Sequence, residues 1–130
     1  IIDQAKAREN VQTLMDKLDV RPNNSVLLGR NLSGGNQQKV VIAKWLGTDS
    51  EIIIFDEPTN GVDIGAKSEI YEIIRELAAS GKSIILVSSE LAEVLSVCDR
   101  ILVMRRGRIS GDFVNQNLTQ EMLMDKAISR

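Results

Sequence analysis

Short apolar runs alternate with helical stretches over the second half of the chain, and this alternation restricts the possible folds more than any other feature. The apolar runs are Ile52–Phe55, Ile84–Val87 and Ile101–Met104, and the stretches 66–80 and 90–97 between them have helical periodicity. A continuous apolar run predicts a strand covered on both faces. Strands that alternate with helices predict an α/β fold, in which right-handed crossover helices join the strands of a parallel sheet.

Further helices and a hairpin are predicted around this sheet. Apolar residues at three- and four-residue spacing predict a helix from about Asp3 to Leu18. A second helix is expected from Ser33, a favoured N-cap residue, to about Leu46. Arg108 to Phe113 is expected to pair with the last strand as a hairpin, and Thr119 to Ile128 to form a final helix. One apolar stripe marks the buried face of the stretch 66–80: Ile70, Ile73, Ile74 and Leu77.

Composition is that of an ordinary globular domain. The 130 residues are 43% hydrophobic and 26% charged, and the net charge of −2 gives no basic surface typical of nucleic-acid binding. Histidine is absent, which excludes histidine catalysis and histidine metal ligands within this chain. Cys98 is expected to be a small buried hydrophobe and Trp45 to pack on the second helix. The chain begins without Met and without a signal peptide, so we expect a segment of a longer protein.

A serine and two glycines open the predicted second helix, in the sequence LSGGNQQ at 32–38. Glycines leave backbone N–H groups uncovered, the helix dipole adds partial positive charge, and the Ser33 hydroxyl adds a donor. Together these groups suit a terminal phosphate. By itself, the same pattern also describes a glycine loop before a capped helix, because short motifs often match by chance.

Two carboxylates, Asp56 and Glu57, follow the first apolar run and precede Pro58. The end of a parallel strand lies at the edge of the sheet where ligands bind. One carboxylate could hold Mg²⁺ and the other could orient and deprotonate an attacking water, although an acidic turn after a strand looks the same. The next loop, TNGVD at 59–63, ends in Asp63, which either caps the following helix or contacts a partner subunit.

In this order, the three segments resemble the signature motif, the Walker B motif and the D-loop of ABC ATPases. The sequences GVDIGAK at 61–67 and VSSE at 87–90 are similar to the second ATPase half of ribose- and galactose-type bacterial sugar importers. The resemblance implies an incomplete ABC ATPase domain. Residues 1–50 would be the end of the helical subdomain with the signature motif, and residues 51–130 would hold Walker B, the D-loop and the C-terminal α/β core.

The resemblance also implies roles for individual residues. Asp56 would serve the Mg²⁺, Glu57 would be the catalytic carboxylate, and Asp63 would lie at the seam of an ATPase dimer. The signature residues would contact the γ-phosphate of ATP held by the opposite domain: Ser33, Gly34, Gly35 and Gln37. The implied partners are a first ATPase half or a second copy, a transmembrane permease and, indirectly, a periplasmic sugar-binding protein. The expected location is the cytoplasmic face of the inner membrane, and no nucleic acid is expected.

Two departures from the family pattern lead to further expectations. Ser89 stands where the family has a switch histidine, and serine cannot carry that charge near neutral pH, so we expect a degenerate site beside an intact signature motif. No G-x-x-x-x-G-K-[ST] sequence is present, so we expect this chain alone to bind nucleotide weakly at best and to be inactive. In the family, the strand before that loop lies between those predicted at 84–87 and 101–104. Either these two close up, or another chain fills the gap and gives a non-native dimer.

Three other interpretations fit parts of the pattern. A nucleic-acid-linked ABC ATPase would share the signature and Walker B motifs, but it should add coiled coils or basic surfaces. A receiver-like phosphoacceptor could use Asp56, but it should place a lysine after a late strand, where this chain has Arg105 and Arg106. A non-catalytic dimerisation or regulatory module would alter the ATPase activity of the first half without chemistry of its own.

Overall fold

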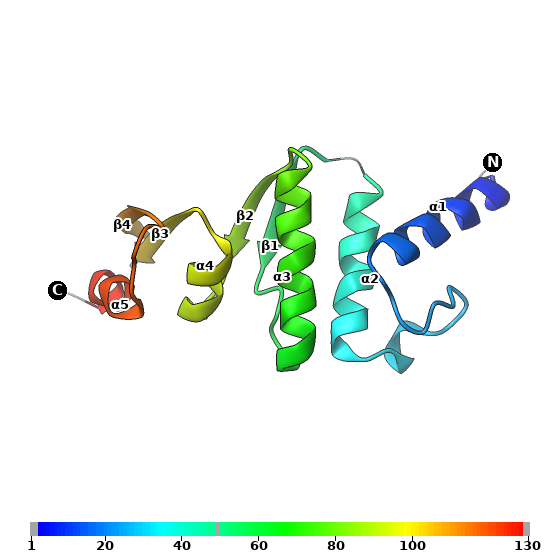
Figure 1. The fold of residues 1–130 in the computed structure, drawn as a ribbon, viewed down its shortest axis with the longest axis horizontal. Coiled ribbons are helices and arrows are strands. Elements are labelled where there is room, and N and C mark those ends of the chain that lie inside the picture. The colour runs from blue at the N-terminus through cyan, green and yellow to red at the C-terminus, as the bar shows by residue number, and fades with distance from the viewer. Residues whose placement is uncertain (1–2, 49, 129–130) are drawn as a thin grey trace. The chain divides into compact units, whose positions relative to one another are not determined.

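The structure is a computed structural model that describes residues 3–48 and 50–128 (Figure 1). The predicted helices and strands lie within two residues of where the sequence placed them, which is the margin within which such ends are defined, and the short 3₁₀ helix η1 was not predicted. In chain order they are α1 (Gln4–Lys17), the 3₁₀ helix η1 (Gly29–Asn31), α2 (Gly34–Leu46), β1 (Ile52–Asp56), α3 (Ile64–Ala79), β2 (Ser83–Val87), α4 (Leu91–Val97), β3 (Arg100–Arg105), β4 (Arg108–Val114) and α5 (Gln120–Ile128).

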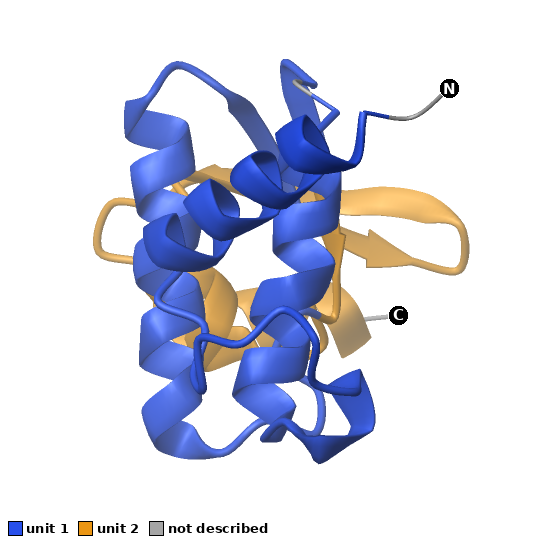
Figure 2. Cartoon of the chain, turned by 90° about the vertical axis from the view of Figure 1, so that its right-hand side faces the viewer, with its two compact units in different colours: residues 1–53, 58–85 blue, residues 54–57, 86–130 orange. Residues whose placement is uncertain are grey.

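The chain divides into two compact units, coloured separately in Figure 2. Unit 1 comprises residues 1–53 and 58–85, and unit 2 comprises residues 54–57 and 86–130. The serine–glycine segment and the TNGVD loop belong to unit 1, whereas the carboxylate pair and Ser89 belong to unit 2. The boundary at residue 50 that the resemblance implies stays a prediction.

Helices α1, α2 and α3 build the core of unit 1. The predicted stripe of α3 is confirmed, because all of its members are buried: Ile70, Ile73, Ile74 and Leu77. Met15 of α1, Leu18 directly after it and Ile42 of α2 are buried as well. The expectation that Trp45 packs is wrong, because it falls outside the buried stripe of α2 and is 56% exposed. Its ring instead has the Lys44 Nζ at 5.7 Å from the centroid.

Strands β1 and β2 pair and run parallel, as predicted. The Ser83 N–H donates to the Glu51 carbonyl at 2.8 Å at one end, and the Glu57 N–H donates to the Val87 carbonyl at 2.9 Å at the other. The amino ends of the two strands are therefore paired with each other, and so are the carboxyl ends, which makes the pair parallel. The carboxylate pair follows directly at the carboxyl end of β1.

The prediction that these strands are covered on both faces is wrong for the described chain. In β1, Ile53 and Phe55 are buried, but Ile52 and Ile54 are 62% and 64% exposed. The same alternation appears in β2, where Ile85 is 51% exposed. Successive side chains of a strand point to opposite faces, so one face of the pair is packed and the other lies open.

The prediction of one parallel sheet is also wrong. Strands β3 and β4 form a separate antiparallel pair, and within the described residues no pairing joins β2 to β3, so these two strands do not close up. The hairpin itself was predicted from the sequence. Arg106 and Gly107 at its turn both have positive φ, 48° and 75°, which is the backbone that two-residue hairpin turns require.

Unit 2 packs α4 and α5 with this hairpin. Ile101 of β3 and Leu123 of α5 are buried here. The side-chain amide of Asn115 donates to the carbonyls of Leu95 and Cys98 at 2.8 and 2.7 Å, which holds the end of α4. Cys98 is half-buried, and this burial raises the pKa of its thiol. Each helix of the described chain is too short or too polar to cross a membrane.

Candidate functional site

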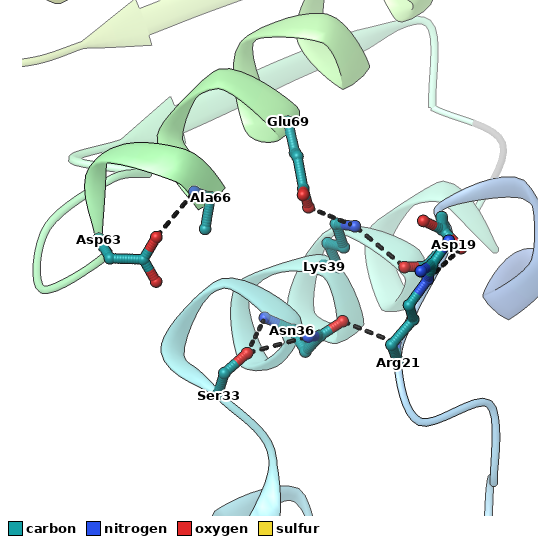
Figure 3. Close-up of polar contacts among 8 residues, drawn as sticks. All are labelled: Asp19, Arg21, Ser33, Asn36, Lys39, Asp63, Ala66 and Glu69. Atoms are coloured by element: carbon teal, nitrogen blue, oxygen red, sulfur yellow. Dashed lines mark hydrogen bonds and ion pairs between the residues drawn. The ribbon is translucent and has the colours of Figure 1, made fainter.

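The start of α2 presents an exposed serine hydroxyl, as the sequence predicted. Ser33 is the N-cap residue, and its Oγ accepts the backbone N–H of Asn36 at 3.4 Å and the Asn36 side-chain amide at 2.9 Å (Figure 3). Both bonds use the oxygen as an acceptor. The hydroxyl hydrogen takes part in neither, so it is available to donate to an anion at the helix end.

The two glycines of this segment differ in their surroundings. Gly34 is exposed, and a Cβ placed there would lie 3.2 Å from the Gly61 carbonyl oxygen. Gly35 is buried, and a Cβ placed there would lie only 2.5 Å from the Ala66 Cβ. Glycine is thus required at position 35 for the close approach of α2 to the first turn of α3, beside any role at a phosphate.

The remaining predicted residues of unit 1 are Gln37 and Asp63. Gln37 is exposed, and its side-chain amide donates to the Leu32 carbonyl at 2.9 Å. Asp63 caps α3, since its carboxylate accepts the Ala66 N–H at 2.9 Å. This cap was one of two roles that the sequence left open, and the other, at a dimer seam, stays a prediction. Figure 3 shows Ser33 and Asp63 at the starts of their two helices.

The carboxylate pair of unit 2 lies at the end of β1. Asp56 is exposed, and Glu57 follows it with a positive φ of 46°. A Glu57 side-chain oxygen accepts the backbone N–H of Ser89 at 2.9 Å. The residue at the switch position therefore contacts the predicted catalytic carboxylate through its main chain and not through its hydroxyl. The adjacent Ser88 hydroxyl oxygen accepts the Glu90 N–H at 3.0 Å just before α4.

A magnesium ion fits this site only with help from a ligand. Among the described residues, no group of three or more acidic or thiol side chains could hold a metal. Mg²⁺ commonly binds one or two carboxylates and completes its shell with water and substrate phosphates. An exposed carboxylate such as Asp56 suits that arrangement.

A polar cluster that the sequence did not predict joins the segment after α1, the first turns of α2 and the first turns of α3. It lines a small cleft and consists of Asp19, Arg21, Asn36, Lys39 and Glu69. Lys39 is buried on α2, with its Nζ 2.8 Å from a carboxylate oxygen of Glu69 and 3.0 Å from the Asp19 carbonyl oxygen (Figure 3). The sequence signal was its position, since Lys39 stands three and four residues before the buried Ile42 and Ala43.

Comparison with known sequences assigns the chain to a family. Residues 2–60 match the family model for ABC transporters. The ribose import ATP-binding protein RbsA of Clostridium perfringens (strain 13 / Type A) is 47% identical over 127 residues, which make up 98% of this chain and 25% of that protein. The xylose import ATP-binding protein XylG of Burkholderia cenocepacia (strain HI2424) is 51% identical over 127 residues, 98% of this chain and 24% of that protein. The chain thus spans about a quarter of the length of the curated relatives it matches.

Solved structures agree with this assignment. An ATP-binding cassette of an ABC transporter in its ADP conformation superposes with a TM-score of 0.77 at 26% identity, over 96% of this chain and 47% of that chain. A dimeric bacterial ABC transporter cassette gives a TM-score of 0.75 over 91% of this chain and 51% of that chain, and its 20% identity supports the fold alone. The motifs, the fold and the sequence identity together show that the chain belongs to the ABC transporter family of ATP-binding proteins, among homologues that are sugar-import ATP-binding proteins.

Proposed function

We propose that this chain is part of the ATP-hydrolysing subunit that powers import of a sugar across the bacterial inner membrane. It supplies the signature motif, Walker B and the D-loop of one ATPase half. The names of its relatives support a sugar as the cargo, because they are import proteins for ribose and xylose. Which sugar is carried is decided by the permease and by the periplasmic binding protein that delivers it.

The observation that carries this proposal is the state of the Ser33 hydroxyl. Its oxygen is occupied by Asn36, so its hydrogen is the group left for an incoming acceptor. It stands at the start of a 13-residue helix, where N–H groups and the dipole favour an anion. The γ-phosphate of ATP bound to the opposite ATPase domain is such an anion. Ser33, Gly34, Gly35 and Gln37 contact it in trans in this proposal, and Asp63 lies at the seam.

The carboxylates of unit 2 serve the chain's own nucleotide site. Asp56 is the residue that would hold Mg²⁺, which when bound supplies positive charge at the phosphate oxygens. Glu57 orients an attacking water and accepts its proton. The Ser89 N–H steadies one oxygen of that carboxylate at 2.9 Å, which leaves the other oxygen for the water. Ser89 itself supplies no charge, which supports a degenerate site beside an intact signature motif.

We also propose that the chain by itself is inactive, because its sequence contains no G-x-x-x-x-G-K-[ST] loop to cradle the phosphates. Calorimetry should detect no ATP binding in the micromolar range, and such binding would contradict this part of the proposal. The open apolar face of β1 and β2 supports self-association of the isolated chain as a non-native dimer. Light scattering at millimolar concentration should then give a mass above 14.4 kDa, whereas a clean monomer would argue against it.

The full-length protein and its permease, reconstituted together in vesicles, test the main proposal. The partners needed are the other ATPase half or a second copy, the permease and the sugar-binding protein, with the ATPase on the cytoplasmic face. ATP on that face should drive uptake of ribose, xylose or galactose from the other side. Uptake that is absent for all three sugars, with ATP hydrolysis that no sugar-binding protein stimulates, would overturn it.

A further inference from the structure

Within unit 1 the start of α2 lies in direct contact with the loop before α3 and with the first turn of α3. A Cβ at Gly35 would lie 2.5 Å from the Ala66 Cβ, and one at Gly34 would lie 3.2 Å from the Gly61 carbonyl oxygen. Real Cβ atoms essentially never approach at the first of these distances. The backbones of α2 and α3 therefore approach so closely at Gly35 and Ala66 that no side chain fits at position 35, and neither helix can move toward the other.

A second contact between the same helices lies one turn further along α2. The Lys39 side chain is 5% exposed, and its Nζ pairs with Glu69 of α3 at 2.8 Å. The same Nζ donates to the Asp19 carbonyl after α1 at 3.0 Å. Burying an ammonium group is costly unless it is paired and hydrogen-bonded, so this side chain holds α2 to both neighbours.

A third contact links Ser33 to the segment after α1. The Asn36 side-chain oxygen accepts the Arg21 backbone N–H at 2.7 Å while its amide nitrogen donates to Ser33 at 2.9 Å. Figure 3 shows these contacts leading from Ser33 through Asn36 to Arg21, and from Lys39 to Glu69. The Ser33 hydroxyl, through Asn36, and the first turns of α3, through Glu69 and Lys39, are therefore both tied to α2 and to the segment after α1.

We propose that the Gly35–Ala66 contact and the Lys39–Glu69 pair form a rigid joint, so that the signature end of α2 and the D-loop move as one body. Lys39 is a positioning residue in this joint and touches no nucleotide. The inference rests on the proposed function. In that function, binding of an ATP phosphate by Ser33 would directly set the position of Asp63 at the dimer seam. Because unit 1 contains the whole joint, no contact with unit 2 is required.

An exchanged pair of side chains tests the Gly35–Ala66 contact in the full-length protein. The measured quantity is amide hydrogen exchange of Val62, Ala66 and Lys67, whose N–H groups bond within the D-loop and the first turn of α3. Gly35→Ala should speed their exchange about tenfold, because overpacking forces the backbones apart. Adding Ala66→Gly should restore the rate to within about threefold, since the nearest remaining atom, the Ala66 Cα, is 3.7 Å away.

The matched control is Gly29→Ala, because a Cβ at Gly29 meets nothing within 4 Å, and it should leave exchange unchanged. The joint is refuted if Gly35→Ala leaves exchange of these amides unchanged. It is equally refuted if the double variant exchanges as fast as the single one, since Gly35 would then act only at the phosphate.

Lys39 provides an independent arm that does not depend on a glycine. Lys39→Met keeps the length of the side chain and removes the charge, so D-loop exchange should rise by at least about threefold. In ATPase assays kcat should fall while KM for ATP changes less than about twofold, as expected for a residue that positions others. Lys39→Arg should recover much of the loss, and Lys44→Met, an exposed change on the same helix, should do nothing.

The two readouts separate the joint from the proposed function. If the full-length protein hydrolyses no ATP in any form, the proposed function fails, yet the exchange pattern still supports or refutes the joint. If ATPase activity falls in Lys39→Met but D-loop exchange stays unchanged, the joint is wrong and the proposed function stands.

Discussion

The two units support their site residues in different ways. Unit 1 holds Ser33 and Asp63 on helix ends that are capped, buttressed by a buried apolar stripe and tied by Lys39. Unit 2 has only three buried apolar side chains among the described residues, Phe55, Ile101 and Leu123. Its exposed apolar residues are more numerous: Ile54, Val87, Leu102, Met104, Ile109, Val114, Met122, Met124 and Ile128.

This difference shows which of the predicted site residues are fixed by contacts within their own unit. The serine–glycine segment is shaped by contacts inside unit 1, which is consistent with its proposed role at a nucleotide held by another domain. In unit 2 the Glu57 carboxylate accepts one hydrogen bond, from the Ser89 main chain, and the neighbouring apolar side chains Ile54 and Val87 are exposed. The two units thus differ in how firmly they hold their predicted site residues, which agrees with the proposed division of labour between two ATP sites.

The largest effect should come from Ser33→Arg, which blocks the helix end with a bulky side chain. In the full-length protein we expect ATPase activity to fall roughly a thousandfold, about 4 kcal/mol of transition-state stabilisation. Ser89→Ala should cost much less, because the N–H that contacts Glu57 belongs to the main chain and remains. Steady-state ATPase assays of both variants, with Ser68→Arg as an exposed control, measure this. Equal losses for Ser33→Arg and Ser89→Ala would break the comparison between the units.

A core substitution should sharpen the comparison next. Ile70 is fully buried in unit 1, and Ile70→Ala should lower the free energy of unfolding by about 3 kcal/mol. Ile109, on the hairpin of unit 2, is 61% exposed, and Ile109→Ala should change the free energy of unfolding by less than about 0.5 kcal/mol. Urea unfolding of the isolated chain, followed by circular dichroism, gives both values. Similar losses at the two positions would mean that the face of the hairpin is covered in solution.

Asn36→Ala should have a smaller effect, confined to unit 1. It removes the acceptor for the Arg21 N–H and the donor to Ser33, at a cost of about 1 kcal/mol, since water can replace the bond to the exposed Arg21. Asn31→Ala in the preceding 3₁₀ helix should be neutral and serves as the control. Thermal unfolding of the two variants tests this, and an unchanged midpoint for Asn36→Ala would remove Asn36 from the frame that holds Ser33.

The smallest effect concerns pH. The hydrogen bond from Arg100 lowers the pKa of Asp112 in unit 2, so the unfolded chain binds the proton more readily. The resulting stability is present above the ordinary carboxyl pKa and is lost as the pH falls through the lower folded value. Asp112→Asn should flatten this decline below about pH 4. Both side chains are at least half exposed, so added salt should weaken the effect. Arg21 lowers the pKa of Asp19 in unit 1 in the same way, so the Asp112→Asn variant should still lose the stability contributed by Asp19 as the pH falls.

The sequence predicted most of the fold, because its boundary residues act locally. Ser33 and Asp63 cap their helices through hydrogen bonds to residues only three positions away. The Arg106–Gly107 turn has two consecutive residues with positive φ, a conformation that few residue pairs adopt. Three motifs in order predicted the family, and the comparisons confirm the family. Residue roles at the nucleotide remain predictions, since they concern partners outside the chain.

The errors come from properties that no local pattern contains. Ile52 and Ile54 are as apolar as Ile53, so the run could not reveal that only one face is packed. Lys39 was overlooked because a charged residue is normally assigned to solvent, and its burial depends on Glu69 and Asp19, thirty and twenty residues away in sequence. The double constraint on Gly35 likewise required knowing where Ala66 lies.

The backbone of Glu57 limits how its chemistry can be probed. Its φ of 46° lies in the left-handed region, which β-branched side chains avoid. Glutamine, asparagine or aspartate can take this conformation, so each alters the functional group and leaves the peptide geometry in place. Valine or threonine would rotate the main chain as well and would displace the hydrogen bonds that Glu57 forms with its neighbours. Only the unbranched replacements can therefore test the proposed role of this carboxylate as a base.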